Sequence, residues 1–220
     1  MITHIEHLFA GGLRELQPEG QRTGIYKHPV VGPALIRRNG IVGDQQADTR
    51  VHGGPEKAVH HYAAQNYAAL AAAFPECAAE LLPGSLGENL SSHGLDERNV
   101  HIGDLYRVGS ALLQVSQPRS PCWKINHRFE AEKMSMFVVQ QHLTGWYYRV
   151  IEQGVVEVGD RVTLVERFTE RFSIDAFWTL QLLHRPQVED LRQLSATPGL
   201  ADEWQARLAG RAEWLASRLG

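Results

Sequence analysis

The sequence predicts a mainly β fold with some α structure, namely a β-barrel followed by a small helical segment. Between residues 1 and 168, short β-branched or aromatic runs alternate with glycine-containing turns, which is the pattern of strands joined by tight turns. After about residue 171, apolar residues recur at helical spacing instead. We therefore expect a barrel domain over residues 1–168 and a three-helix segment over residues 172–220.

The strands are predicted from five apolar runs and the turns between them. Gly109 and Ser110 separate two runs as a tight turn. Gly-Asp pairs at 103–104 and 159–160 each precede a run, where glycine can adopt a positive φ and aspartate can cap the turn. The expected strands are residues 23–26, 58–62, 105–108, 111–115 and 161–165.

Two helices are predicted within the barrel domain. The first is the alanine-rich segment 63–73, which should end near Pro75. The second is residues 131–143, which carry apolar side chains at helical spacing before Gly145. Those apolar side chains are expected to be core residues.

Three further helices are predicted in the C-terminal segment. Ser173 is a candidate N-cap for a helix that runs to Leu182, and residues 188–194 and 200–219 repeat the amphipathic pattern. Their apolar faces, tryptophans included, must pack together or onto the barrel.

Composition excludes several functional classes. The chain of 220 residues has a formal net charge of -3 and no Lys/Arg stripe interleaved with aromatics, so polymeric nucleic acid is not an expected partner. Two cysteines provide neither a disulfide framework nor the four thiolates of an ordinary iron–sulfur cluster. The N-terminus lacks a signal-peptide pattern, and no run of about eighteen apolar residues occurs. We expect a cytoplasmic protein without a membrane partner.

The segment 117–124 (QPRSPCWK) is the strongest candidate site. Cys122 lies between Arg119 and Lys124, and nearby cations favour the thiolate, which is the nucleophilic and metal-binding form of cysteine. Prolines at 118 and 121 stiffen the loop. The alternative is that Cys122 is merely a buried small hydrophobe. Cys77 has no such neighbours and is expected to pack in a helix.

A second candidate lies in segment 43–62, which combines turn glycines, aspartates, histidines and a lysine. Gly53 and Gly54 allow close backbone approach and can expose amides to an anion, with Lys57 adding positive charge. A phosphate or other oxyanion is therefore an expected guest. Zinc is disfavoured, because the spacing does not match a helical zinc motif and adjacent strand histidines face opposite ways. The residues in this segment whose side chains are of a type that can bind zinc are Asp44, Asp48, His52, His60 and His61.

A third segment, residues 87–90 (GENL), contains Glu88, which can be either a solvated surface charge or a site carboxylate, and Asn89. Phosphate-loop and dinucleotide fingerprints do not occur, so ATP and NAD are poorly supported as ligands.

Taken together and in this order, these three segments resemble the MOSC domain family, and most closely its YiiM-like branch, which is associated with resistance to 6-N-hydroxylaminopurine. The resemblance covers nearly the whole chain, including the C-terminal three-helix segment. It implies a β-barrel that binds the molybdenum cofactor (molybdopterin), with Cys122 as a molybdenum ligand. The candidate cofactor-binding residues on the matching segments are Gly53, Gly54, Lys57, Asn89, Arg119, Ser120 and Lys124.

The resemblance further implies an oxidoreductase, independent of pyridoxal phosphate, that reduces small N-hydroxylated compounds to amines. The chain has no nicotinamide or flavin fingerprint, so an external reductase should supply electrons. The helical segment is a candidate docking surface for it, and the oligomeric state is not predicted. The proton donor is left open between His52 and Glu88.

Two other functions compete with this one. A carrier module would hold molybdenum cofactor or sulfur on Cys122 without turnover. A cysteine hydrolase would use Cys122 as nucleophile and His52 or His61 as base, but no orienting partner or oxyanion hole can be located in the sequence.

Overall fold

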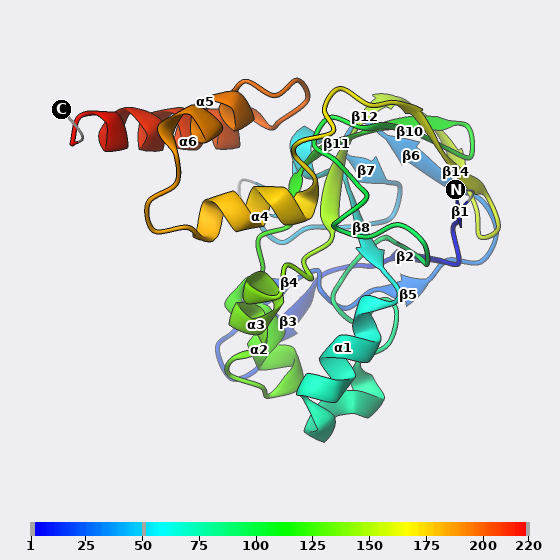
Figure 1. Cartoon of the computed structure of the whole chain (residues 1–220). Coiled ribbons are helices and arrows are strands. Elements are labelled where there is room, and N and C mark those ends of the chain that lie inside the picture. Colours follow the sequence, from blue (N-terminus) through cyan, green and yellow to red (C-terminus); the bar gives the residue numbers. More distant parts are fainter. Residues whose placement is uncertain (1–2, 50–51, 219–220) are drawn as a thin grey trace.

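The computed structural model describes residues 3–49 and 52–218, and a nine-stranded sheet organises it (Figure 1). All strand pairs in this sheet are antiparallel except β8 with β9. Within the described residues the sheet is open, so the mainly β fold is confirmed and "barrel" describes it loosely. In spatial order the strands are β1 (Thr3–His4), β14 (Arg161–Glu166), β10 (Leu105–Val108), β11 (Ala111–Pro118), β12 (Trp146–Glu152), β8 (Val59–Ala63), β9 (Leu90–Ser92), β2 (His7–Ala10) and β5 (His28–Pro29).

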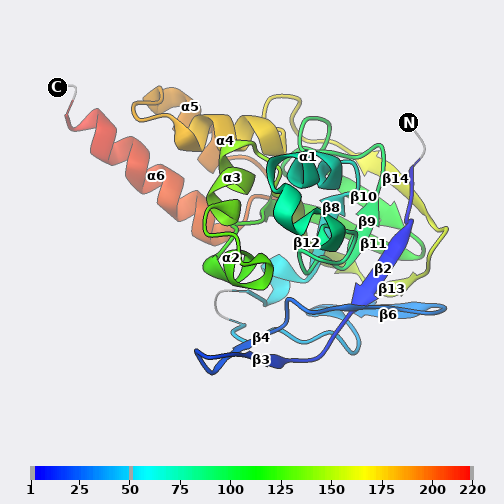
Figure 2. The ribbon, with the colours of Figure 1, turned by 90° about the horizontal axis from the view of Figure 1, so that it is seen from below.

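Two smaller sheets lie along one side of the molecule in Figure 2. One contains β13 (Gly154–Val156), β6 (Ala34–Arg37) and β7 (Gly40–Ile41), and the other pairs β3 (Arg14–Leu16) with β4 (Gln21–Thr23). The expected strand at 23–26 is wrong beyond Thr23. There the Thr23 hydroxyl accepts a hydrogen bond from the Ile25 amide at 3.2 Å, a local turn that ends strand pairing.

The other four predicted strands are present, within one or a few residues of their expected bounds. The turn at Gly109 has a positive φ of 55°, as its glycine suggested. Strand β12 was not predicted, although it lies between β11 and β8 and is central to the sheet. Its partner β11 continues beyond the expected end, to Pro118, and so delivers the chain directly to the cysteine loop.

Five short helices lie between the strands of the described residues. They are η1 (Pro55–Lys57), α1 (Asn66–Ala73), η2 (Pro75–Glu80), α2 (Trp123–Phe129) and α3 (Met134–Gln140). The expected helix at 131–143 is therefore shorter than predicted, and α2, which begins directly after Cys122, was missed. Cys77 is 4% exposed in a hydrophobic cluster, which confirms its packing role.

The C-terminal helices are α4 (Ile174–Leu182), α5 (Val188–Ser195) and α6 (Asp202–Ala216). The Ser173 hydroxyl accepts from the Ala176 amide at 3.0 Å, which confirms the N-cap. The last helix begins two residues later than expected, and its predicted end at Leu219 lies outside the described residues.

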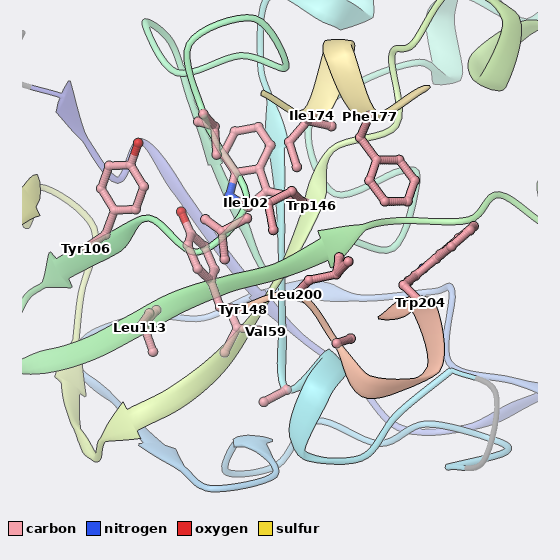
Figure 3. Close-up of a cluster of buried hydrophobic side chains, with 14 of the residues drawn as sticks. Val59, Ile102, Tyr106, Leu113, Trp146, Tyr148, Ile174, Phe177, Leu200 and Trp204 are labelled. Atoms are coloured by element: carbon pink, nitrogen blue, oxygen red, sulfur yellow. The ribbon is translucent and has the colours of Figure 1, made fainter. Parts of the chain in front are cut away.

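The C-terminal helices and the sheet share one hydrophobic core. Figure 3 shows Phe177 and Trp204 in the same hydrophobic cluster as Trp146 and Tyr148 of β12, and the rings of Phe177 and Trp204 meet edge to face at 4.8 Å. The Trp178 indole also donates to the Thr144 hydroxyl at 2.9 Å. The C-terminal helices thus pack onto the sheet as well as on one another, while the domain boundary near residue 170 stays a prediction. No helix in residues 3–49 and 52–218 is long and apolar enough to cross a membrane.

Candidate functional site

One cavity brings together residues from all three candidate segments. It encloses about 600 Å³ of space, part of it open to solvent. Strand β11 and the start of α2 place the cysteine loop on one wall, and η1 and the loop before it form a second. Of the predicted site residues, the cavity is lined by His52, Lys57, Asn89, Arg119, Cys122 and Lys124.

Four predicted site residues do not line the cavity. Gly53 packs against Gln46, where an added Cβ would lie 3.2 Å from that side chain, and Gly54 starts η1 with a φ of 88°. Ser120 is exposed. Glu88 is fully buried, so it is not a surface charge, and it accepts hydrogen bonds elsewhere, from the Tyr67 hydroxyl and the Gly84 amide at 2.6 Å each.

Asp44 organises the wall opposite the cysteine loop. Its carboxylate accepts from the Gly11 amide at 2.9 Å, from the Gln46 amide group at 3.1 Å and from the Asn89 amide group at 3.0 Å, and it pairs with the Lys27 ammonium. The Asn89 side chain also accepts from the His60 backbone amide at 3.0 Å. Asp44 and Asn89 therefore use their polar atoms to hold the wall together.

The cavity is strongly cationic. Lys27, Lys57, Arg119 and Lys124 line it, and among the described lining residues Asp44 is the carboxylate that opposes them. Lys124 donates to the Arg22 carbonyl at 2.7 Å, and Lys57 lies 3.6 Å from Glu203 of α6. Such an excess of positive charge favours an anionic ligand.

Arg119 has one buried donor atom that is not paired within the part of the chain that the structure describes. Its side chain is buried, and one terminal nitrogen donates to the Leu86 carbonyl at 3.2 Å. The other, Nη1, is buried with no hydrogen-bond partner in the described residues. Leaving a buried donor unpaired costs roughly 1–3 kcal/mol, and more when it is charged, so an acceptor in the cavity would stabilise this group.

Two histidines line the cavity in neutral form. Burial, followed by the charges of Lys124, Arg119 and Lys57, lowers the pKa of His52 to about 4. Burial and the charges of Arg119 and Lys27 hold the pKa of His60 well below its ordinary value. At neutral pH, each ring is therefore expected to be the neutral imidazole, with one ring nitrogen protonated, rather than the imidazolium cation.

His61 faces away from the cavity, as expected for the residue after His60 in a strand. Its ring nitrogens contact the Tyr148 hydroxyl at 3.1 Å and the Ser92 hydroxyl at 2.7 Å, so it is a core residue. Among the residues that the structure describes, no three His, Cys, Asp or Glu side chains are grouped to hold a metal ion by themselves.

Sequence reasoning missed Lys27 and Tyr147, which line the cavity, and considered His60 only as a disfavoured zinc ligand. His60 could have been found from strand alternation, because its neighbours Val59 and His61 both face the core. Tyr147 stacks near His60, with ring centroids 5.2 Å apart. Lys27 offered no sequence signal.

Comparison with known proteins identifies the family. The MOSC domain model matches residues 48–163. Protein YiiM of Escherichia coli (strain K12) is 37% identical over 214 residues, which cover 94% of this chain and 95% of that protein. The crystal structure of YiiM from Escherichia coli superposes with a TM-score of 0.81 at 30% identity, covering 96% of this chain and 92% of the other. A protein of Gibberella moniliformis named "Reductase" is 35% identical over 174 residues, 75% of this chain but 30% of that longer protein. The resemblance seen in the three segments is thus confirmed, and the chain belongs to the MOSC domain family.

Proposed function

We propose that this protein binds the molybdenum cofactor and reduces N-hydroxylated compounds to amines with electrons from an external reductase. One observation carries the proposal: Cys122 opens onto the same cavity as Lys27, Lys57, Arg119 and Lys124. A soft thiol ligand among several cations suits a metal that is delivered by a polyanionic organic group.

The residues present fit that group. Cys122 would ligate the metal, and the unpaired Arg119 Nη1, together with Lys57 and Lys124, would hold a phosphate. When bound, the molybdenum cofactor would supply two-electron oxygen-transfer chemistry. The relative named "Reductase" supports an oxidoreductase of this general kind.

The chain's own residues would position the substrate and handle protons. The balanced reaction is R–NHOH + 2 e⁻ + 2 H⁺ → R–NH₂ + H₂O, so two protons must reach the cavity. We favour His52 over Glu88 as the residue that transfers them, because His52 lines the cavity and Glu88 lies behind its wall. An anion bound near Lys124 and Arg119 would offset the charges that depress the pKa of His52 and so let the ring take up a proton.

The same low pKa disfavours a cysteine hydrolase. A general base is most effective when its pKa lies near the working pH, and His52 is far more acidic than that. His61, the other candidate base, is enclosed in the core beside Tyr148 and Ser92.

The test compares Cys122→Ala with Cys77→Ala in a host that makes molybdenum cofactor. Bound molybdenum and released pterin are measured per chain. Each purified protein is then supplied with reduced methyl viologen and 6-N-hydroxylaminopurine, and the formation of adenine is followed by chromatography. We expect near-stoichiometric metal and turnover in the wild type and in Cys77→Ala, and loss of both in Cys122→Ala.

Each other result contradicts a named part of the proposal. Full molybdenum in Cys122→Ala would refute the ligand assignment. A wild type without molybdenum or pterin would refute the cofactor. Stoichiometric cofactor with no turnover of N-hydroxylated purines, amidines or hydroxamic acids would refute the reductase and support the carrier module.

A further inference from the structure

A second groove adjoins the cofactor cavity on the side formed by β4, β6 and β7. It is broad and open, with about 1330 Å³ of space, and Arg22, Arg37 and Arg38 line it. Asp44, Gln45 and Gln46 line both this groove and the cofactor cavity, so segment 44–46 is a wall common to the two. Figure 2 shows β3, β4 and β6 together along one side of the molecule, with α4 and α5 on the other.

The three arginines of this groove are gathered in one place. All three are exposed, and within the described residues none pairs with a carboxylate. Asp44 is the acidic residue among those that line the groove, but its side chain is only 1% exposed and already paired with Lys27. The groove therefore presents net positive charge, although Glu15 lies across from Arg22 in the β3–β4 pair.

Some exposed arginines elsewhere have acidic partners, whereas others, such as Arg161 and Arg185, have none within the described residues. Arg107 pairs with Glu152 at 2.6 Å, and Arg171 pairs with Asp190 at 2.5 Å. On α5 and α6, Arg192 and Arg207 lie 4.0 and 3.8 Å from Glu189 and Glu203. The C-terminal helices thus carry mixed and paired charge, whereas the groove carries net positive charge in a chain whose net charge is -3.

The proposed reaction needs electrons from outside the chain, and this inference rests on that proposed function. We propose that the groove of Arg22, Arg37 and Arg38 is the docking surface for an acidic electron-transfer protein, of the ferredoxin or flavodoxin class. The common wall at 44–46 places such a donor next to the cofactor cavity. An open groove suits a protein surface, because small-molecule sites are more enclosed. Opposite charges would also speed and orient the encounter.

The experiment uses cofactor-loaded protein and a plant-type [2Fe–2S] ferredoxin as the acidic probe. Ferredoxin delivers one electron per encounter, so two encounters serve each turnover. The test variant is Arg37→Glu/Arg38→Glu, and the matched control is Arg192→Glu/Arg207→Glu, which reverses two exposed charges on α5 and α6. Binding of dye-labelled ferredoxin is measured by fluorescence anisotropy at low and high salt. Turnover is measured with ferredoxin and, separately, with reduced methyl viologen, which needs no docking surface.

We expect the wild type to bind ferredoxin at low salt and to lose affinity as salt rises. The groove variant should bind at least about tenfold more weakly, with a matching rise in KM for ferredoxin, because a reversed charge repels the acidic face. Its turnover with methyl viologen should equal that of the wild type. The control variant should behave as the wild type in all three measurements.

Four results would overturn the docking surface. The first is a wild type that does not bind ferredoxin at low salt, and the second is a groove variant that binds ferredoxin as well as the wild type does. The third is a control variant that loses as much affinity for ferredoxin as the groove variant. The fourth is a groove variant that instead loses turnover of a phosphorylated substrate with methyl viologen. The last would make the groove a substrate-phosphate site. Failure of the proposed function is distinct from these, since it would appear as a wild type without turnover even with methyl viologen.

Discussion

The ion pair between Asp44 and Lys27 should be among the most sensitive contacts in the cavity wall. Both side chains are nearly inaccessible, at 1% and 6% exposure, and Asp44 also binds Gln46 and Asn89. Asp44→Asn keeps the shape but removes the charge, so the buried Lys27 loses the carboxylate with which it is paired. Burial already lowers the pKa of Lys27, and the attraction of Asp44 opposes that shift.

The magnitude follows from the burial of both partners. Removing one partner of a buried ion pair typically costs about 3–5 kcal/mol, whereas replacing both with matched apolar groups is often neutral. We therefore expect Asp44→Asn to lower the free energy of unfolding by about 3 kcal/mol, more than a hundredfold in the folding equilibrium. Lys27→Met should cost less, because Asp44 keeps three other hydrogen-bond donors.

A double-mutant cycle tests these values. The free energy of unfolding is measured by urea denaturation for the wild type, both single variants and the double variant. The double variant should be more stable than the sum of the single losses predicts, with a coupling energy above about 1 kcal/mol. An Asp44→Asn variant within about 0.5 kcal/mol of the wild type, or losses that add without coupling, would contradict this account of the wall.

Two further predictions concern strand β8 and its neighbours. Gly145→Ala should lower the free energy of unfolding by more than about 2 kcal/mol, because Gly145 has a φ of 67° and a new Cβ would lie 2.4 Å from the His61 carbonyl oxygen. Gly159→Ala is the control in thermal melts, since it shares a positive φ but meets nothing within 4 Å, and equal losses would refute the steric cause. Burial lowers the pKa of His61 from 6.5 to about 3, so its contribution to stability is present above pH 6.5 and is lost as the pH falls toward 3, because the unfolded chain takes up the proton first. Between pH 7 and pH 4.5 the wild type should therefore lose roughly 3 kcal/mol more than His61→Gln in urea denaturation, and parallel losses would argue against His61 as the acid-sensitive group.

Local sequence patterns predicted the parts of the fold that depend on local interactions. The turn at Gly109 and the N-cap at Ser173 need only neighbouring residues, and both are found where the sequence indicated. Strand β12 was missed although its seven residues include three aromatic and two β-branched ones, which favour strands, and its place in the sheet depends on pairing with β11 and β8. The strand expected at 23–26 ends at Thr23 because of a local contact rather than a distant one. The Thr23 hydroxyl accepts a hydrogen bond from the Ile25 backbone amide, which a strand would use for pairing.

The candidate site likewise contains some residues that local sequence patterns reveal and others that only the tertiary structure brings to the cavity. Cys122, Arg119 and Lys124 are close in sequence, so their charge pattern is visible without a structure. Lys27 reaches the cavity only because Asp44, far along the chain, binds its ammonium group. Glu88 is of a residue type that suits an active site, but its side chain is directed toward the Tyr67 hydroxyl. No local sequence pattern specifies where Tyr67 lies.

Both the cofactor cavity and the adjoining groove are lined by several cations, and this shared charge links the two proposals. The chain is acidic overall, with a net charge of -3, yet seven of its 22 lysines and arginines line the cofactor cavity or the groove beside it. Holding like charges close together, with Arg119 Nη1 unpaired and Lys27 buried, opposes folding and must be offset by the core shared between sheet and helices. Such local conflicts are typical of functional sites, where a ligand resolves them. An anion in the cavity would meet the charge of Arg119 and Lys124, and an acidic protein would meet that of Arg37 and Arg38, so the two halves of the positive surface call for different partners.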